Sequence, residues 1–517
     1  MTQEHISLSD LAQLTTHVST FLSKELNVGL GDVVAVYSRN SIWYPVAMLS
    51  AVRIGAMACP ISPDYTADEL MHGLNLARPK VIFTSVELIN GAQAAAEKLG
   101  VPRRRRRVDA SSDPFETNSI QDVAAIGKTY CPEDQALVYR VPSAKTNHSV
   151  CAVLCFSSGT TGLPKAVMIS HANIIAQCLQ IQQITPVDHD KILAALPYNH
   201  ITGIIHQLHL PILLQANVYI LPKFNFEDML RIVMENKIKE LLTVPPILVR
   251  LVQQPHIVAK YNLSHLRRFS TGAAPLPNEI LKRLEQQFPQ TGFKQAYGMT
   301  ESTSAICSHP PTKYAYKYGS KVGMIVASTE VKIVDPGTGQ ICGVGEAGEI
   351  WVRGPQVVMG YLDNQEATAD TIDQAGFLHT GDIGNVDEEG FLSITDRIKE
   401  MIKVKGVGVA PAEIENFLLG HPAVQDCAVC GISDERAGER PKAFVVMANS
   451  SLNPVVTAEK LLAFSKKESS REKAIKEIAI VTAIPKSPSG KTLRRELNKL
   501  QQERILAVAQ DKIMSRM

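Results

Sequence analysis

The sequence predicts an α/β protein in which a large N-terminal domain of parallel α/β subdomains is followed by a smaller α+β domain. Near the N-terminus, the β-branched runs VVAVYS (33–38) and KVIFT (80–84) flank an apolar, helical stretch at 44–54. This alternation is typical of βαβ units and a parallel sheet. After residue 320 the pattern changes to strands separated by glycines, and from about Lys399 charged helices and strands alternate.

Composition excludes several classes of protein. The chain has 517 residues, of which 45% are hydrophobic and 20% charged, as in ordinary soluble globular proteins. Its net charge of +2 gives no electrostatic reason to expect nucleic acid or an anionic membrane as a partner. The longest apolar runs, such as 204–214, are interrupted well short of the roughly 20 residues that a membrane helix needs. We therefore expect no nucleic-acid partner and no integral membrane association.

The N-terminus and the cysteines favour an intracellular protein. The first residues, MTQEHISLSDLAQL, lack the charged and then apolar segments of a secretory signal. Nine cysteines, an odd number spread along a long chain, fit reduced thiols better than a disulfide framework. Cys427 and Cys430 form a Cys-x-x-Cys pair, but their neighbours in VQDCAVCGI predict a buried strand rather than a redox or zinc site.

A loop rich in glycine and hydroxyl residues, SSGTTGLPK at 157–165, follows the strand predicted at VCAVLCF. After it, Ser170 is expected to cap a helix whose apolar face carries Ile174, Cys178 and Ile181. Strand, loop and helix in this order predict a phosphate-binding site, with a flexible solvent loop as the alternative.

This loop is not the Walker P-loop of nucleoside triphosphatases. That motif has glycine before the lysine and Ser or Thr after it, whereas Lys165 lies between Pro164 and Ala166. The hydroxyl that would hold a metal ion beside the lysine is therefore missing, which argues against a P-loop mechanism.

The later part of the chain predicts two further units. VKIVDPGTGQ, GEAGEIWVRG and GFLSITD are expected to form hairpins or a small β-barrel-like subdomain. Beyond them, APAEIENFLLG reads as a helix and KAFVVMA as a strand. We place the domain boundary between Asp396 and Lys399, so that residues 1–396 form the N-terminal domain and 397–517 the C-terminal one.

Six motifs occur in the order known from one family. They are SSGTTGLPK (157–165), YGMTES (297–302), GEIWVRG (348–354) with GY (360–361), TGD (380–382), DRIKEMIKVKG (396–406) and PKSPSGK (485–491). From about residue 8 to residue 497, the chain resembles the adenylate-forming superfamily of acyl-CoA synthetases, luciferases and peptide-synthetase adenylation domains. It looks closest to 4-coumarate:CoA ligase-like enzymes.

The resemblance implies a reaction with two steps that uses ATP, Mg²⁺ and coenzyme A. A carboxylate attacks the α-phosphate of ATP to give an acyl-adenylate and pyrophosphate, and the thiol of CoA then displaces AMP. Each step needs charge stabilised at a different place. The small-molecule acid and CoA are the expected partners.

The resemblance also implies the residues of the nucleotide site. Phosphates would be held by Ser157, Ser158, Gly159, Thr160, Thr161, Gly162 and Lys165. Adenine would lie between Tyr297 and the segment around Gly272, Ala273 and Ala274, beside Gln295, Ala296 and Gly298. The ribose would be bound by Asp382 and Arg397, while Lys403, Lys405 and Gly406 complete the set.

By the same resemblance, other residues take catalytic roles. Thr300 would donate to the α-phosphate, and Thr160 and Glu301 would be the Mg²⁺ ligands. Lys491 would bridge the carboxylate and the α-phosphate from a mobile C-terminal domain. Lys399 would be the hinge about which that domain swings between the two steps.

The acyl site is expected beside His200, near the reacting carboxylate. Its predicted lining residues are Ile201, Thr202, Ser270, Ala273, Ser304 and Ala305. Where coumarate ligases offer a lysine and a tyrosine to the phenol, this chain has Ser270 and Thr202. Because an unpaired buried hydroxyl is costly, we predict a hydrophobic acid, either aliphatic or a non-hydroxylated aryl acid.

Gly408 keeps alternative functions open. Coumarate ligases carry a glutamine there that helps bind the adenylate during thioester formation. The alternatives are transfer of the acyl group to an amine or a carrier protein, or a luciferase-like oxygenase. A non-catalytic nucleotide-binding relative is disfavoured, since Glu301, Asp382, Arg397 and Lys491 are all present.

Two charged segments concern location and partners. The chain ends Ser515-Arg516-Met517, a variant of the Ser-Lys-Leu address, which predicts a peroxisomal import receptor as a partner and a peroxisomal rather than cytoplasmic location. The arginine run at 103–107 predicts an exposed loop, with a targeting or anion-binding patch as the alternative.

Overall fold

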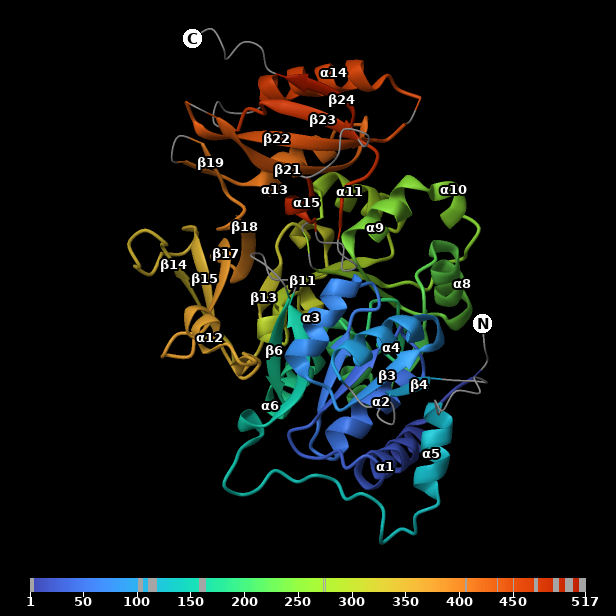
Figure 1. Ribbon diagram of the computed structural model, residues 1–517. Coiled ribbons are helices and arrows are strands. Elements are labelled where there is room, and N and C mark those ends of the chain that lie inside the picture. Colours follow the sequence, from blue (N-terminus) through green and yellow to red (C-terminus); the bar gives the residue numbers. More distant parts are fainter. Residues whose placement is uncertain are drawn as a thin grey trace.

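The computed structural model is shown in Figure 1. It describes residues 4–100, 106–109, 119–157, 164–272, 274, 276–404, 407–434, 436–449, 451–468, 473–486, 492–497 and 505–510. Several predicted site residues lie outside these ranges: Ser158, Gly159, Thr160, Thr161, Gly162, Ala273, Lys405, Gly406, Lys491, Ser515, Arg516 and Met517. Residues 103–105 of the arginine run also lie outside them.

The first sheet contains the predicted βαβ unit. It has seven strands in the order β16-β6-β5-β2-β1-β3-β4. β1 (Val33–Tyr37) pairs in parallel with β2 (Met57–Ile61) and β3 (Val81–Ser85), and α2 (Trp43–Arg53) connects β1 to β2. The sheet also includes β4 (Arg106–Asp109) and β16 (Gly360–Tyr361).

Helices cover both faces of this sheet. Since successive residues of a strand point to opposite sides, each central strand contributes side chains to two hydrophobic cores. Val34 and Val36 pack in one core with residues of α1 (Leu8–Lys24), α2, α5 (Ile120–Lys128) and α6 (His171–Gln183). Val33 and Ala35 pack in another core with α3 (Ala67–Ala77) and α4 (Ile89–Lys98).

The glycine-rich loop connects two strands, so the predicted order of strand, loop and helix was wrong. β5 (Cys151–Ser157) pairs with β6 (Lys165–Ser170) in antiparallel fashion, with Ser157 opposite Lys165. The predicted helix, α6, starts only after β6, and Ser170 caps it as expected, accepting from the Asn173 amide at 3.1 Å. The alternating Val167 and Ile169 in KAVMIS bury one side of β6 and favour a strand. The segment between β5 and β6 therefore connects two antiparallel strands and does not directly precede a helix.

The second sheet joins parallel and antiparallel strands in one path of nine, β14-β15-β17-β18-β13-β12-β11-β10-β9. β9 (Glu240–Thr243), β10 (Arg268–Thr271) and β11 (Gly292–Met299) are parallel. β11 also pairs in antiparallel fashion with β12 (Ser304–Ser308), and so connects both halves. The predicted hairpins are present as β14 (Glu330–Val334) with β15 (Gly348–Arg353), and β17 (Leu378–Val386) with β18 (Phe391–Arg397), while β13 (Gly323–Ile325) links them to β12.

The remaining elements of the N-terminal part surround this sheet. A two-stranded sheet is formed by β7 (Lys191–Ala194) and β8 (Asn217–Ile220), and between them lie a π-helix (Gly203–His209) and α7 (Leu210–Leu214). Further helices are α8 (Phe226–Asn236), α9 (Pro245–Gln253), α10 (Pro255–Val258), α11 (Asn278–Gln287) and α12 (Gln365–Thr371). Short 3₁₀ turns span Val86–Leu88, Asn147–Ser149, Thr300–Ser302, Pro311–Lys313 and Tyr316–Tyr318.

The C-terminal domain lies at the top of Figure 1 and has its own sheet and core. Its strands are β19 (Ile402–Val404), β20 (Val407–Val409), β21 (Val424–Asp434), β22 (Gly438–Met447), β23 (Glu477–Val481) and β24 (Ile505–Gln510). Its helices are α13 (Pro411–Leu419), α14 (Pro454–Glu468) and α15 (Arg494–Leu497). Cys427 and Cys430 are buried free thiols in β21, which confirms the predicted strand.

The predicted boundary between Asp396 and Lys399 lies where β18 ends and before β19 begins, and it stays a prediction. The two parts touch there, because the Ala412 amide donates to Asp396 at 2.9 Å. In the described part of the chain, no helix is both long and apolar enough to span a membrane.

Candidate active site

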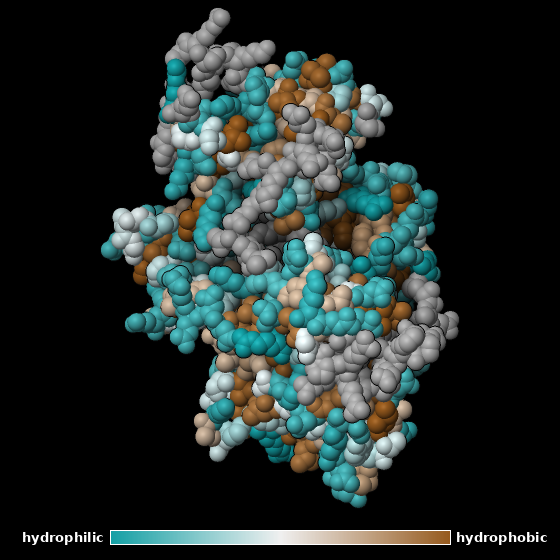
Figure 2. Space-filling model, in the orientation of Figure 1, coloured by the Kyte–Doolittle hydropathy of each residue, from teal (hydrophilic) through white to brown (hydrophobic). Residues whose placement is uncertain are grey.

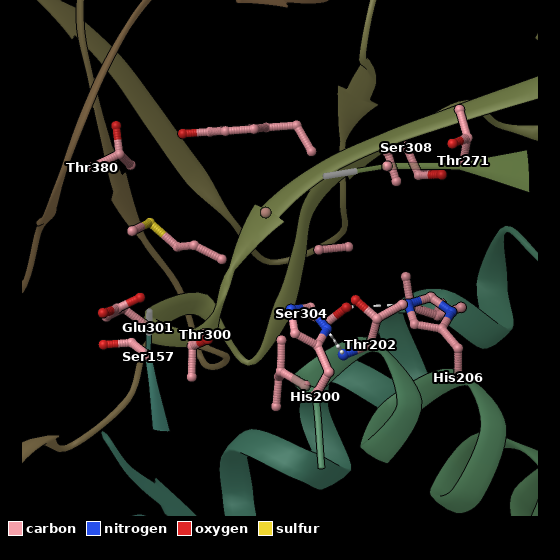
Figure 3. A pocket seen from close by; sticks show the side chains of 18 of the residues that line it. Ser157, His200, Thr202, His206, Thr271, Thr300, Glu301, Ser304, Ser308 and Thr380 are labelled. Carbon is pink, nitrogen blue, oxygen red and sulfur yellow. Dashed lines mark hydrogen bonds between the residues drawn. The ribbon is translucent and has the colours of Figure 1, made fainter. Parts of the chain in front are cut away.

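A cavity of about 490 Å³ brings together most of the predicted site residues that are described. Figure 3 shows part of its lining, and in Figure 2 the surface is hollowed between the C-terminal domain and the domain below it. The predicted residues that line it are Ser157, Lys165, His200, Ile201, Thr202, Ser270, Gly272, Ala296, Tyr297, Gly298, Thr300, Glu301, Ser304, Ala305, Arg397 and Lys399.

Four predicted residues do not line this cavity. Asp382 lies directly behind the wall, in contact with two lining residues. Ala274 and Gln295 are absent from the wall, and Gln295 is buried on β11 between Lys294 and Ala296, which do line it. This follows from the alternation of side chains along a strand. Lys403 is exposed on β19, in the C-terminal domain.

Glu301 and Lys165 meet through Tyr361 at one end of the cavity, which we call the nucleotide end (Ser157, Lys165, Thr300, Glu301 and Tyr361). The Tyr361 hydroxyl donates to Glu301 Oε1 at 2.9 Å, and Lys165 Nζ lies 4.7 Å from the centre of the Tyr361 ring. Burial and then the charge of Glu301 raise the pKa of Tyr361, which keeps its hydroxyl a donor. In Figure 3, Ser157, Thr300 and Glu301 lie together at this end.

Sequence reasoning missed the role of Tyr361, although GY at 360–361 was one of the motifs. Glu301 itself is 7% exposed and follows β11, where Gly298 leaves no room for a side chain. A Cβ at Gly298 would lie 1.5 Å from the Ser304 carbonyl oxygen. The glycine of YGMTES therefore allows β12 to pass close to β11 just before Glu301.

The carboxylate of Glu301 fits a magnesium ion. Its Oε1 accepts from Tyr361, and among the described residues Oε2 of this buried, cavity-lining carboxylate has no hydrogen-bond partner. Magnesium in nucleotide enzymes is often held by one or two carboxylates together with substrate phosphates. Thr160, the other predicted ligand, lies outside the described residues.

Asp382, the predicted ribose-binding carboxylate, has a tyrosine and an arginine among its partners. The Tyr297 hydroxyl donates to Oδ2 at 2.7 Å, and Arg397 Nε lies 3.1 Å from Oδ1. Burial and then the charge of Asp382 raise the pKa of Tyr297, so the phenol remains protonated. Tyr297 is therefore fixed by its hydroxyl while its ring lines the cavity.

His200 lies between the two ends of the cavity and is neutral near physiological pH. Burial lowers the pKa of His200 to about 4. Its Nδ1 accepts from the Thr202 amide at 3.3 Å, so the proton of the neutral ring is on Nε2. This arrangement leaves an N–H donor in the wall of the cavity, as a site for a carboxylate requires.

The other end of the cavity carries charged residues that the sequence analysis did not select. The lining includes His189, His206, Glu240 and Lys294. Burial alone would raise the pKa of Glu240, but the charge of Lys294 and contacts with His189 and Arg268 hold it well below its usual range. The expectation that Ser270 and Thr202 leave this pocket without a strong polar partner therefore does not hold.

The predicted hinge residue Lys399 lines the cavity, and its neighbour is tied to the C-terminal domain. Glu400 pairs with Arg494 of α15, whose Nη2 also lies 2.8 Å from Glu415. Burial is opposed by Glu415 and Glu400, and the pKa of Arg494 is raised. This buried ion-pair network fixes how α15 sits against the segment after β18.

Known proteins resemble the chain over almost its full length. Residues 1–362 match the family described as "AMP-binding enzyme", and residues 413–491 match "AMP-binding enzyme C-terminal domain". Peroxisomal OPC-8:0-CoA ligase 1 of Arabidopsis thaliana is 35% identical over 504 residues, covering 96% of this chain and 89% of that protein. The 4-coumarate--CoA ligase-like protein 2 of the same plant is 36% identical over 479 residues, covering 92% and 83%.

A solved structure has the same overall fold. ATP-bound MatB from Rhodopseudomonas palustris superposes with a TM-score of 0.82 and 26% identity, covering 96% of this chain and 93% of that one. The order of the motifs and these matches agree, and the chain belongs to the AMP-binding enzyme family of adenylate-forming enzymes.

Proposed function

We propose that the protein is an ATP-dependent acid:CoA ligase that forms an acyl-adenylate and then an acyl-CoA thioester. The observation that carries this proposal is one continuous cavity. It joins Glu301 and Lys165 at one end to His200, and continues to the end that carries Glu240 and Lys294. Relatives that match nearly the whole chain are named as CoA ligases.

In the first step, the chain binds both reactants around His200. The Nε2 proton of His200 can donate to the acid, and Thr300 can donate to the α-phosphate. Lys165 and the loop that precedes it hold the β- and γ-phosphates, which leave as pyrophosphate. A magnesium ion, when bound at Glu301, neutralises phosphate charge. Lys491 is the proposed bridge between the carboxylate and the α-phosphate.

In the second step, the C-terminal domain turns about Lys399 so that CoA can displace AMP. Gly408 is the residue that bears on the acceptor, and it lies exposed on β20. A Cβ there would come within 2.8 Å of Met401 Cε, the flexible end of a side chain. A larger residue could therefore be accommodated, so glycine is not demanded by packing. An amine or carrier protein as the acceptor is the second candidate.

A peroxisomal location is part of the proposal. A relative that is 35% identical is named as peroxisomal, and the chain ends Ser515-Arg516-Met517. A fluorescent fusion that keeps this C-terminus should enter peroxisomes, and deletion of the three residues should release it to the cytoplasm. The same distribution for both fusions would contradict the proposed address.

Pyrophosphate release with a panel of carboxylic acids, with and without CoA, tests the proposed function. We expect acid-dependent pyrophosphate release and an acyl-CoA in the mass spectrum only when CoA is present. An adenylate that accumulates without thioester would favour an amine or a carrier protein as the acceptor. Failure of every acid to release pyrophosphate would contradict adenylate formation itself.

A further inference from the structure

The end of the cavity away from Glu301 is polar because one face of three parallel strands carries polar side chains there. Glu240 of β9, Ser270 of β10 and Lys294 of β11 line the cavity. Ser270 is paired with Lys294 in the register of β10 and β11. The opposite face of these strands carries Phe269 and Phe293, which are buried in a hydrophobic core.

Lys294 is a buried ammonium with open hydrogen-bond donors. Its side chain is 10% exposed, and its partner is Glu240 Oε1 at 3.9 Å, which is beyond hydrogen-bond distance. Within the described ranges, Lys294 Nζ has no hydrogen bond. An ammonium has three N–H donors, and leaving them desolvated without acceptors is costly.

Glu240, in contrast, is already satisfied by other residues. Arg268 Nε donates to Oε2 at 2.9 Å, and the Ser270 hydroxyl donates to Oε1. His189 Nδ1 lies 3.3 Å from Oε2. Glu240 therefore does not need Lys294 as a donor, and the ammonium is available to a ligand in the cavity.

His206 and two serine hydroxyls are neutral polar groups at this end. His206 Nε2 and Ser304 Oγ form a hydrogen bond of 3.2 Å, and burial lowers the pKa of His206 to about 3. The Ser308 hydroxyl is buried and has no hydrogen-bond partner in the described part of the chain. Figure 3 shows His206 and Ser308 at the end opposite Glu301.

The charged side chains Glu240, Lys294, Arg268 and Asp188 pair with one another before any acid binds. Lys294 faces Glu240, and Arg268 Nη2 pairs with Asp188 at 2.7 Å. A second carboxylate on the acid would add an uncompensated buried charge, which is strongly unfavourable. A hydrocarbon end would leave the Lys294 donors and the Ser308 hydroxyl desolvated without partners. A neutral oxygen avoids both costs.

We propose that the polar end of the cavity (Glu240, Ser270, Lys294 and Ser308) selects carboxylic acids that carry a carbonyl or hydroxyl oxygen at their far end, with Lys294 as the donor to that oxygen. This inference rests on the proposed function and specifies its substrate class. It also replaces the prediction of a hydrophobic acid that was based on Ser270 and Thr202, because the donor, Lys294, lies on the neighbouring strand β11.

Acid-dependent exchange between ATP and labelled pyrophosphate tests the proposal. A series of acids of increasing length is compared in four forms: unsubstituted, oxo, hydroxy, and with a second carboxylate at the far end. We expect at least one length at which an oxo or hydroxy acid has a kcat/KM about tenfold or more above both the unsubstituted and the dicarboxylic acid. Lys294→Met should bring the ratio of kcat/KM for the oxo or hydroxy acid to that for the unsubstituted acid close to one. Lys294→Gln should retain part of this preference, since an amide still donates.

Lys165→Met is the matched control, because it makes the same substitution at the nucleotide end. It should lower exchange with both acids by the same factor and leave their ratio unchanged. Thermal unfolding of each variant reports on folding, and Lys294→Gln alone carries the test if Lys294→Met does not fold.

The proposal is overturned if unsubstituted or dicarboxylic acids are preferred at every length, or if the preference survives in folded Lys294→Met. Exchange with unsubstituted acids alone would leave the proposed function intact and contradict only this inference. No exchange with any acid would contradict the proposed function together with it.

Discussion

The nucleotide end and the polar end of the cavity hold their charged residues in different ways. At the nucleotide end, Glu301 accepts from Tyr361 and Lys165 lies over the same ring. At the polar end, Lys294 is buried but has no hydrogen bond in the described structure. The residues of the nucleotide end, whose proposed ligand is the same for every acid, are held in place before binding, as preorganised catalysis requires. Lys294, the proposed contact of the variable part of the acid, has its donors open.

The largest expected effect separates two lysines of the adenylation step. Lys491→Ala should abolish acid-dependent pyrophosphate release, because Lys491 is the proposed bridge at the reacting α-phosphate. Lys165→Ala should reduce release less, because Lys165 is the proposed contact of the phosphates that leave. Comparable losses in the two variants would overturn this ranking.

Glu301→Gln should come next, with adenylation of all acids about a hundredfold slower or more, since one preorganised charged group at a reacting phosphate contributes on that scale. The measurement is kcat for pyrophosphate exchange. Glu389→Gln, at an exposed position between β17 and β18, is the matched control and should leave kcat unchanged. Full activity of Glu301→Gln would contradict the proposed role of Glu301 in adenylation.

Tyr361→Phe should have a smaller effect. It keeps the ring under Lys165 and removes the hydroxyl that donates to Glu301. Hydrogen bonds to charged groups are worth about 1.5–3 kcal/mol, which corresponds to a loss of about tenfold to a hundredfold in kcat. A loss as large as that of Glu301→Gln would mean that Tyr361 contacts the substrate directly.

The smallest effect expected is on stability and concerns the polar end. Burial lowers the pKa of His206 from 6.5 to about 3, so the unfolded chain binds a proton more readily than the folded one. The free energy of unfolding should therefore fall as pH drops below 6.5, by about 2 kcal/mol between pH 7 and pH 5 for this residue. His206→Gln should remove that share in urea unfolding at the two pH values. An unchanged pH dependence would show that His206 is protonated at little cost.

The nucleotide end could be predicted from sequence because its residues lie in short motifs. Glu301 follows Gly298 closely, and Tyr361 ends its own motif, so spacing along the chain reports on spacing in the site. Strands β1, β3 and β5 and the capped helix α6 were likewise predictable from the sequence pattern. β6 was missed because KAVMIS is short and no strand was predicted between the loop and the helix.

The polar end could not be predicted in this way. Glu240, Ser270 and Lys294 come from three strands separated by whole helices, and only the register of β9, β10 and β11 brings them together. Reasoning from Ser270 alone therefore missed the lysine one strand away. The available signal was a charged residue within a short strand, such as Lys294 next to the buried Phe293.

The most direct test of the account is a double-mutant cycle of Glu301→Gln and Lys294→Met, measured as kcat/KM for a preferred oxo or hydroxy acid and its unsubstituted analogue. Effects of distant sites usually add. We predict that Glu301→Gln lowers both values by one factor, that Lys294→Met changes their ratio, and that the double variant shows both effects. A ratio that changes with Glu301→Gln, or that stays constant with Lys294→Met, would contradict the division of work between the two ends.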